Sequence, residues 1–122
     1  MILADTSIWI DHLRAGNLQL QQLLGQGQVV IHPLVIGELA LGSFKERSKA
    51  LTLLDLLPQV RVAQLSEVRH TIEARRLYGR GIGLIDAHLI ASVFLSSATL
   101  LWTRDKRLRK VAESHRIHAE LR

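Results

Sequence analysis

The chain contains no cysteine and only two prolines, and aromatic residues make up just 4% of it. Without cysteine it can form no disulfide, no zinc–thiolate site and no cysteine nucleophile, and a reducing cytoplasm is its natural setting. Pro33 and Pro58 each stand where one predicted segment gives way to the next. Because we find no internal repeat, low-complexity tract or linker, we expect a single domain over residues 1–122.

Long hydrophobic runs are also missing. The longest, around residues 53–57, is interrupted by Asp55 and is far shorter than a membrane-spanning helix. The first residues lack the charged start and the long apolar stretch of a signal peptide. We therefore expect a soluble, cytoplasmic protein with no membrane association.

Positive charge is what the chain has in excess: 16 Lys and Arg against 11 Asp and Glu, a formal net charge of +5. Much of it lies in residues 104–110, where five cations surround Asp105. A basic surface favours polyanions such as nucleic acid, and the plain alternative is a solvated helix face. An acid among these cations suggests a bridging metal ion. The candidate polyanion contacts are Arg104, Lys106, Arg107, Arg109 and Lys110.

Short apolar runs alternate with amphipathic stretches along the chain. Strands are predicted over residues 2–4, 29–31 and 99–102, with a further candidate at 60–62. Helices are predicted over residues 8–14, 18–24, 33–42, 45–57, 66–78, 84–96 and 105–114. Thr6 or Ser7 is the expected cap of the first helix and Ser66 of the fifth. This alternation predicts an α/β fold with three layers, α/β/α, around a central parallel sheet.

Two acids follow predicted strands. Asp5 comes directly after the first strand, and Asp105 comes shortly after the strand over residues 99–102. Ligands of such sheets bind at the carboxyl ends of the strands, so both acids are expected at that edge. A turn or helix-cap role is the alternative for each of them.

Two further acids share helix faces with apolar residues. Glu38 lies on one helical stripe with Leu34 and Leu41, and Asp86 opens a stripe of apolar residues at i+3, i+4 and i+7. Acids are seldom buried unless they are paired or bound to a cation, and the alternative partner is a buried arginine. Four acids expected at one edge form an all-oxygen set suited to Mg²⁺ or Mn²⁺ rather than Zn²⁺.

Four segments containing these acids resemble the acidic motifs of the PIN-domain nucleases. They are Asp5-Thr6-Ser7, Gly37-Glu38-Leu39, the segment over residues 81–91 that contains Asp86, and Thr103-Arg104-Asp105. The similarity covers essentially the whole chain, in order and with appropriate spacing. The subgroup that it resembles most is the VapC-like toxins of type II toxin–antitoxin pairs.

The resemblance implies a PIN-like fold, a homodimer, an endoribonuclease that depends on Mg²⁺ or Mn²⁺, and a cognate antitoxin that blocks the site. It places Asp5, Glu38, Asp86 and Asp105 on the family's four acids, as catalytic and metal-binding residues. Thr6 or Ser7 and Thr103 fall on supporting hydroxyl positions, and the basic residues of segment 104–110 become candidate RNA or antitoxin contacts.

The chemistry then needs a nucleophile and neutralisation of charge on the phosphate, and a metal ion can supply both. We expect Asp5 and Asp86 to hold the main cation, and Glu38 and Asp105 to hold its waters or a second cation. Attack by water rather than by the 2′-OH would leave a 5′-phosphate.

Other readings of the sequence remain open. His115 and His118 have helical spacing for a metal but lack an acidic third ligand, and His88 is expected at the surface because it points away from Asp86. A phosphoacceptor receiver domain would need adjacent acids after the first strand, and they are missing. A non-catalytic RNA- or protein-binding module of the same fold is the stronger alternative, since its charge and fold would look the same.

Overall fold

The structure is a computed structural model that describes residues 1–121. Seven helices and three strands occur in this part of the chain, and all seven predicted helices are among them. The strands are β1 (Ile2–Ala4), β2 (Val29–Val30) and β3 (Leu100–Trp102). The helices are α1 (Thr6–Ala15), α2 (Leu18–Gly25), α3 (Pro33–Ala40), α4 (Arg47–Asp55), α5 (Leu65–Ala74), α6 (Leu84–Leu95) and α7 (Lys106–Ser114).

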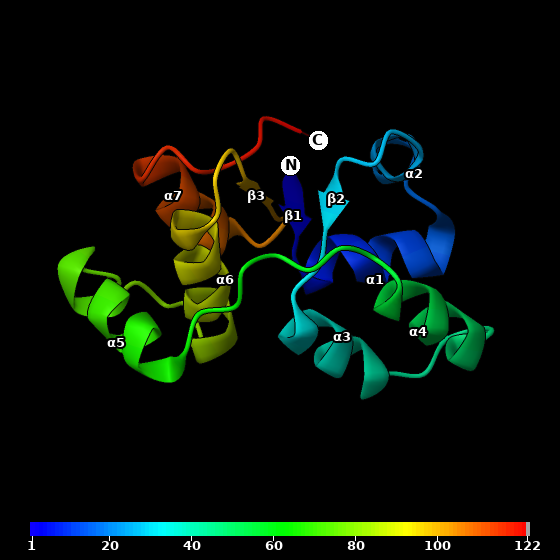
Figure 1. The fold of residues 1–122 in the computed structure, drawn as a ribbon, viewed down its shortest axis with the longest axis horizontal. Coiled ribbons are helices and arrows are strands. Elements are labelled where there is room, and N and C mark those ends of the chain that lie inside the picture. Colours follow the sequence, from blue (N-terminus) through cyan, green and yellow to red (C-terminus); the bar gives the residue numbers. More distant parts are fainter. Residues whose placement is uncertain (122) are drawn as a thin grey trace.

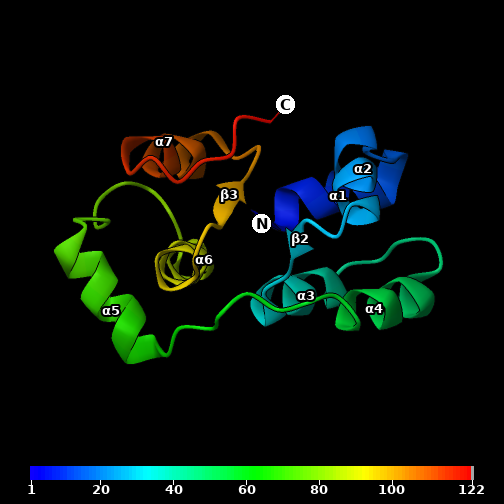
Figure 2. The same ribbon diagram turned by 45° about the horizontal axis from the view of Figure 1, so that its top comes forward.

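The three strands form a parallel sheet in the order β2-β1-β3. In the centre, Leu3 of β1 pairs with Val30 on one side and with Leu101 on the other. Helices cover both faces of the sheet: in Figure 2, α1, α2 and α7 lie on one side of the strands and α3, α4 and α6 on the other, while Figure 1 shows α5–α7 toward the β3 edge and α1–α4 toward the β2 edge. The predicted three-layer α/β/α fold with a central parallel sheet is therefore confirmed.

The candidate strand over residues 60–62 is wrong. A single parallel bridge joins Gln59 to Ile31 at the β2 edge of the sheet, and a similar bridge joins His118 to Leu101 at the β3 edge. Beyond Gln59 the backbone turns to α6, where the N–H of Arg61 donates to Ser96 Oγ at 3.3 Å. A ladder cannot continue here because serine side chains take the N–H groups that a neighbouring strand would need.

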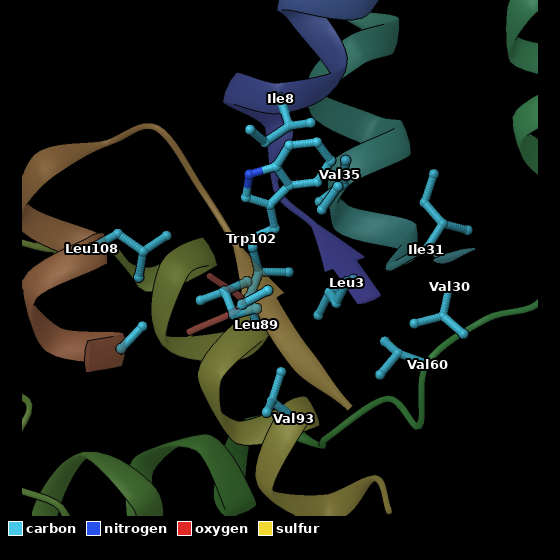
Figure 3. Packing of buried hydrophobic residues seen from close by; sticks show 14 of the residues in the cluster. Leu3, Ile8, Val30, Ile31, Val35, Val60, Leu89, Val93, Trp102 and Leu108 are labelled. Carbon is cyan, nitrogen blue, oxygen red and sulfur yellow. The ribbon is translucent and has the colours of Figure 1, made fainter. Parts of the chain in front are cut away.

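The core forms around the sheet. β1 is covered on both faces, and this is why Leu3 and Ala4 are completely buried. Every layer contributes to the packing in Figure 3, with Leu3 and Trp102 from the strands, Ile8 from α1, Val35 from α3, Leu89 from α6 and Leu108 from α7. None of the helices in residues 1–121 has the length and apolar character needed to cross a membrane.

The cap of helix α5 lies two residues earlier than predicted, and the helix ends at Ala74 rather than at residue 78. Its cap is Gln64 rather than Ser66, which lies inside the first turn. The N–H of Gln64 donates to Glu67 Oε1 at 2.9 Å, so the acid of the first turn satisfies the free backbone donor.

Candidate active site

Asp5 stands at the junction of β1 and α1. Its N–H donates to the Trp102 carbonyl at 3.0 Å, which extends the β1–β3 ladder by one bond. Its carboxylate then caps α1, because Oδ1 accepts from the N–H of Ile8 at 3.2 Å. The predicted cap at Thr6 or Ser7 is therefore wrong. Both residues lie in the first turn of the helix, where their hydroxyl groups are free to bond to carboxylates.

The Asp5 carboxylate is buried among hydroxyl groups. Ser7 Oγ donates to Oδ1 at 2.5 Å, and Thr103 Oγ1 donates to Oδ2 from the end of β3. Burial raises the pKa of Asp5, while the hydrogen bonds from Ser7, Thr103 and Ile8 offset part of that rise. The carboxylate is thus fixed in orientation by neutral donors, and its negative charge is left to be balanced by something else.

Glu38 projects from the second half of α3 toward α1. Thr6 Oγ1 donates to Glu38 Oε1 at 2.5 Å, and this bond brings the acid beside the residue that follows Asp5. The predicted apolar stripe is wrong, because Leu41 is 91% exposed and the buried residues of the helix are Val35 and Leu39. The contact between α1 and α3, rather than burial of that stripe, therefore positions Glu38.

Asp86 lies in the first turn of α6. Its Oδ2 accepts from the N–H of Gly83 at 3.2 Å. Burial raises the pKa of Asp86, and the charges of Asp5, Asp105 and Glu38 raise it further, against a lowering by the Gly83 hydrogen bond. Charges act in this way only across short distances, so the structure brings the other three acids within electrostatic reach of Asp86. We call these four residues the rim acids.

Asp105 is the most exposed of the rim acids and caps α7. Its Oδ1 accepts from the N–H of Leu108 at 2.9 Å, and its own N–H donates to Thr103 Oγ1 at 3.0 Å. Thr103 thus contacts both Asp5 and Asp105. The cap accounts for the position of Asp105, and its further role stays a prediction.

None of the rim acids forms an ion pair in residues 1–121, even though arginines are close in sequence. Arg104, which precedes Asp105, pairs with Asp11 at 3.3 Å, and Arg109 pairs with Glu113 at 3.5 Å. The buried-arginine alternative for these acids therefore has no support in the described part of the chain. Two of the five candidate RNA contacts already have an acidic partner.

The rim acids suit a hard divalent cation by their chemistry. They offer carboxylate oxygens, their mutual repulsion raises the pKa of Asp86, and a divalent ion would relieve that repulsion. Across residues 1–121, no three His, Asp or Glu side chains already form a closed ligand group. Mg²⁺ does not require one, because it keeps several of its own waters and is commonly bound through one or two carboxylates.

Two histidines meet between the helices that contain Glu38 and Asp86. The rings of His32 and His88 lie 6.2 Å apart at 70°, and Nδ1 of His88 is buried, so the predicted surface role of His88 is wrong. His32 is completely buried, and its Nδ1 accepts from the N–H of Leu34 as the cap of α3. Sequence reasoning missed His32, and its place before Pro33 at a helix start was the available signal.

The candidate metal pair at the end of the chain is not assembled. His115 packs edge-on against Phe94 at 6.0 Å between ring centroids, while His118 is buried beside β3. Neither histidine belongs to a potential metal-binding group within residues 1–121.

A groove opens beside Glu38. It has a volume of about 440 Å³ and lies between α1, the end of α3 and the loop that leads to α4. Its walls are apolar at Ile10, Leu13 and Phe44, and Arg14 and Lys45 also line it. A molecule seated in this groove would therefore contact one of the rim acids.

Comparisons with known proteins agree with this architecture. A model of the PIN domain family matches residues 2–114. Two curated relatives, both named Ribonuclease VapC32, come from Mycobacterium tuberculosis strains CDC 1551 / Oshkosh and ATCC 25618 / H37Rv. Each is 53% identical to this chain over 109 residues, which cover 89% of this chain and 88% of the relative.

Proposed function

This chain belongs to the PIN domain family, and on that basis we propose that it is an endoribonuclease, the VapC-like toxin of a toxin–antitoxin pair. The printed name of the two relatives supports a hydrolase that cleaves RNA. The observation that carries the proposal for this chain is the gathering of the rim acids around Asp86 with no ion-pair partner in residues 1–121.

The roles of the rim acids follow from their surroundings. Asp5 and Asp86 hold the catalytic cation, because one is fixed by hydroxyl donors and the other faces the three remaining acids. Glu38, oriented by Thr6, and Asp105, oriented by the first turn of α7, hold its water ligands or a second cation. Ser7 and Thr103 keep the Asp5 carboxylate in one orientation.

The cofactor in this proposal is Mg²⁺ or Mn²⁺. When bound, such an ion supplies a water of lowered pKa and withdraws negative charge from the phosphate. Attack by this water, rather than by the RNA's own 2′-OH, with departure of the 3′-oxygen would leave a 5′-phosphate and a 3′-hydroxyl.

Two protein partners belong to the proposal. The first is a cognate antitoxin that covers the site, and the groove beside Glu38 supports it, since an apolar segment seated there would block the rim. The second is another copy of the chain, because the VapC-like family implies a homodimer. Light scattering of the protein alone and with its antitoxin tests both associations.

The test of the activity is cleavage of a labelled RNA pool by the purified protein. We expect cleavage with millimolar Mg²⁺ or Mn²⁺, none with EDTA, and products that a 5′-phosphate-dependent exonuclease degrades. Asp86→Asn should abolish the cleavage. Asp11→Asn is the matched control, because it removes the same charge from an acid outside the rim.

Three results would contradict the proposal. Cleavage that persists in EDTA would contradict the metal dependence. Products with a 2′,3′-cyclic phosphate would contradict attack by water. RNA binding without any cleavage, with every cation tried, would favour a non-catalytic module of the same fold.

A further inference from the structure

The loop before α6 touches the first turn of α7 at a glycine. Gly81 has a φ of +78°, a conformation that side chains rarely adopt. A Cβ atom built on Gly81 would lie 2.9 Å from Cδ of Arg107 and 3.1 Å from its Nη1. The stem of the Arg107 side chain therefore rests directly on the Gly81 backbone, in a space that exists only because this residue has no side chain.

This contact joins the two segments that contain Asp86 and Asp105. Gly81 lies in the loop that ends at Gly83, whose N–H donates to the Asp86 carboxylate. Arg107 lies in the first turn of α7, which Asp105 caps. Arg107 thus reaches from the helix that Asp105 caps to the loop that leads to Asp86.

Arg107 also differs from the arginines around it. Arg104 and Arg109 are held in ion pairs with Asp11 and Glu113, whereas Arg107 is exposed and has no acidic partner in the described chain. Its position is set by contact with a backbone rather than by a carboxylate. The guanidinium N–H groups therefore remain available to an external anion, on a side chain that has already lost part of its freedom.

We infer that Arg107, seated on Gly81, binds a phosphate of the RNA next to the one that is cleaved. The inference rests on the proposed ribonuclease function and assigns to one residue the substrate contact that the basic segment 104–110 could only suggest as a group. A guanidinium can donate two parallel hydrogen bonds to one phosphate, and a fixed guanidinium beside the rim acids would set where the backbone of the RNA passes. Arg107 is a substrate-binding residue in this scheme.

The experiment measures binding rather than cleavage. A fluorescein-labelled single-stranded RNA pool of mixed sequence is titrated with the protein in EDTA, and anisotropy gives Kd at several salt concentrations. Arg107→Gln should weaken binding about tenfold and lower the slope of log affinity against log salt by about 0.7. Lys110→Gln removes the same charge from the same helix and should change Kd by less than about threefold.

Glycine variants test the seat itself. Gly81→Ala should weaken binding nearly as much as Arg107→Gln, because the new Cβ displaces the arginine stem. Gly79→Ala is the control: its φ is +69°, and a Cβ there meets nothing within 4 Å. In the Arg107→Gln background, Gly81→Ala should have no more effect than Gly79→Ala, which is the signature of coupled residues. Melting curves of each variant show that it is folded.

Equal losses of RNA affinity in Arg107→Gln and Lys110→Gln would overturn the inference and show that only the total charge of the segment matters. Equal losses in Gly81→Ala and Gly79→Ala would show that the contact between Arg107 and Gly81 does not contribute to binding. An unchanged Kd in Arg107→Gln would also overturn the inference and would favour a contact of this arginine with a protein partner. These outcomes are independent of cleavage. A protein that binds RNA through Arg107 without cutting it would contradict the proposed activity, while Arg107 would still be a phosphate-binding residue.

Discussion

Asp11 and Glu113 each lie against an arginine, whereas the four rim acids have no such partner among residues 1–121. The contrast is sharpest around Arg104, because it is the neighbour of Asp105 in sequence and yet its guanidinium reaches Asp11. Arg104 and Arg109, which pair with Asp11 and Glu113, both come from the basic segment 104–110. Arginines are therefore present in the sequence beside Asp105, and the fold pairs these two with acids outside the rim.

The difference shows how a protein of net charge +5 can keep an acidic site. Ion pairs between exposed residues contribute little stability, so the pairs Arg104–Asp11 and Arg109–Glu113 add little to the free energy of unfolding. Pairing of the rim acids would instead lower activity, because a bound arginine would occupy the place of a divalent cation. Arg104 and Arg109 therefore belong to the basic segment that can attract a polyanion, but their guanidinium groups pair with acids other than the carboxylates that would act on it.

The largest effect should appear when the two sets of acids are neutralised in parallel. Glu38→Gln keeps an oxygen for the Thr6 hydrogen bond but removes the charge, and we expect at least a ~100-fold loss of RNA cleavage, because the proposal has this charge hold a water ligand of the cation or a second cation. Glu113→Gln makes the same chemical change outside the rim and should stay within about threefold of the wild type. Initial rates at saturating Mg²⁺ measure both. Equal losses would erase the distinction between the two sets.

Metal should stabilise the protein through the rim and nowhere else. At 100 times its Kd, a bound cation adds about 2.7 kcal/mol to the free energy of unfolding. Asp86 has a raised pKa, so its ionised form costs stability at neutral pH, and that cost disappears as pH falls through the raised value. Asp86→Asn should therefore melt higher than the wild type in EDTA and gain little from Mg²⁺ or Mn²⁺.

The matched variant is Asp11→Asn, which should gain as much from the metal as the wild type does. Calorimetric scans with EDTA and with millimolar metal compare the three proteins. If metal raises the melting temperature of Asp86→Asn as much as that of the wild type, the cation binds elsewhere.

A buried base provides a third comparison, with the opposite response to acid. Burial, together with the charge of His88, lowers the pKa of His32 to about 4, so the folded protein keeps this ring neutral. Below the unfolded value of 6.5 only the unfolded chain takes up the proton, and the fold loses stability as pH falls. Between about pH 7.5 and about pH 5 the loss should be roughly 2 kcal/mol.

Urea unfolding across this pH range, for wild type and His32→Asn, measures the effect. Asparagine can still cap α3 but does not titrate, so the variant should be less stable at neutral pH and show a flatter pH dependence. What remains in the variant is the contribution of the acids. Parallel pH curves for the two proteins would mean that His32 takes up its proton without unfolding.

The smallest effect should come from the surface pairs. Asp11 accepts from Asn17 at 3.2 Å as well as from Arg104, and both contacts are partly exposed. Asp11→Ala should lower the free energy of unfolding by no more than about 1 kcal/mol. Chemical denaturation at low and high salt measures this loss, and a loss of several kcal/mol would show that the pair is structural.

The sequence predicted the buried face of α6, which Asp86 opens, correctly. The residues at i+3, i+4 and i+7 from it are buried, so the helix face deduced from spacing is the face that packs. The same reasoning failed for Glu38, because α3 is apolar almost all round and spacing alone cannot choose its buried side. Contact with Thr6, a residue 32 positions earlier, places that acid, and no local pattern records it.

Helix caps were harder to predict for a similar reason. Asp5, Thr6 and Ser7 are all favourable cap residues, and the choice among them depends on where β1 ends. That point is fixed by the bond from the Asp5 N–H to Trp102, on a strand that is far away in sequence. The pairing of His32 with His88 and the seat of Arg107 on Gly81 are also long-range contacts, and they became visible only in three dimensions.

The central place of β1 has a consequence for the time at which this protein becomes active during its own synthesis. A nascent chain that ends before residue 100 already contains Asp5, Glu38 and Asp86, but it lacks β3 and Thr103, whose hydroxyl orients the Asp5 carboxylate. Ribosomes add about 5–20 residues each second, so the segment from Asp5 to Asp86 is made before β3 can dock beside β1. The messenger being read is therefore not exposed to a complete site on the growing polypeptide until β3 and Thr103 have been made and have docked on β1.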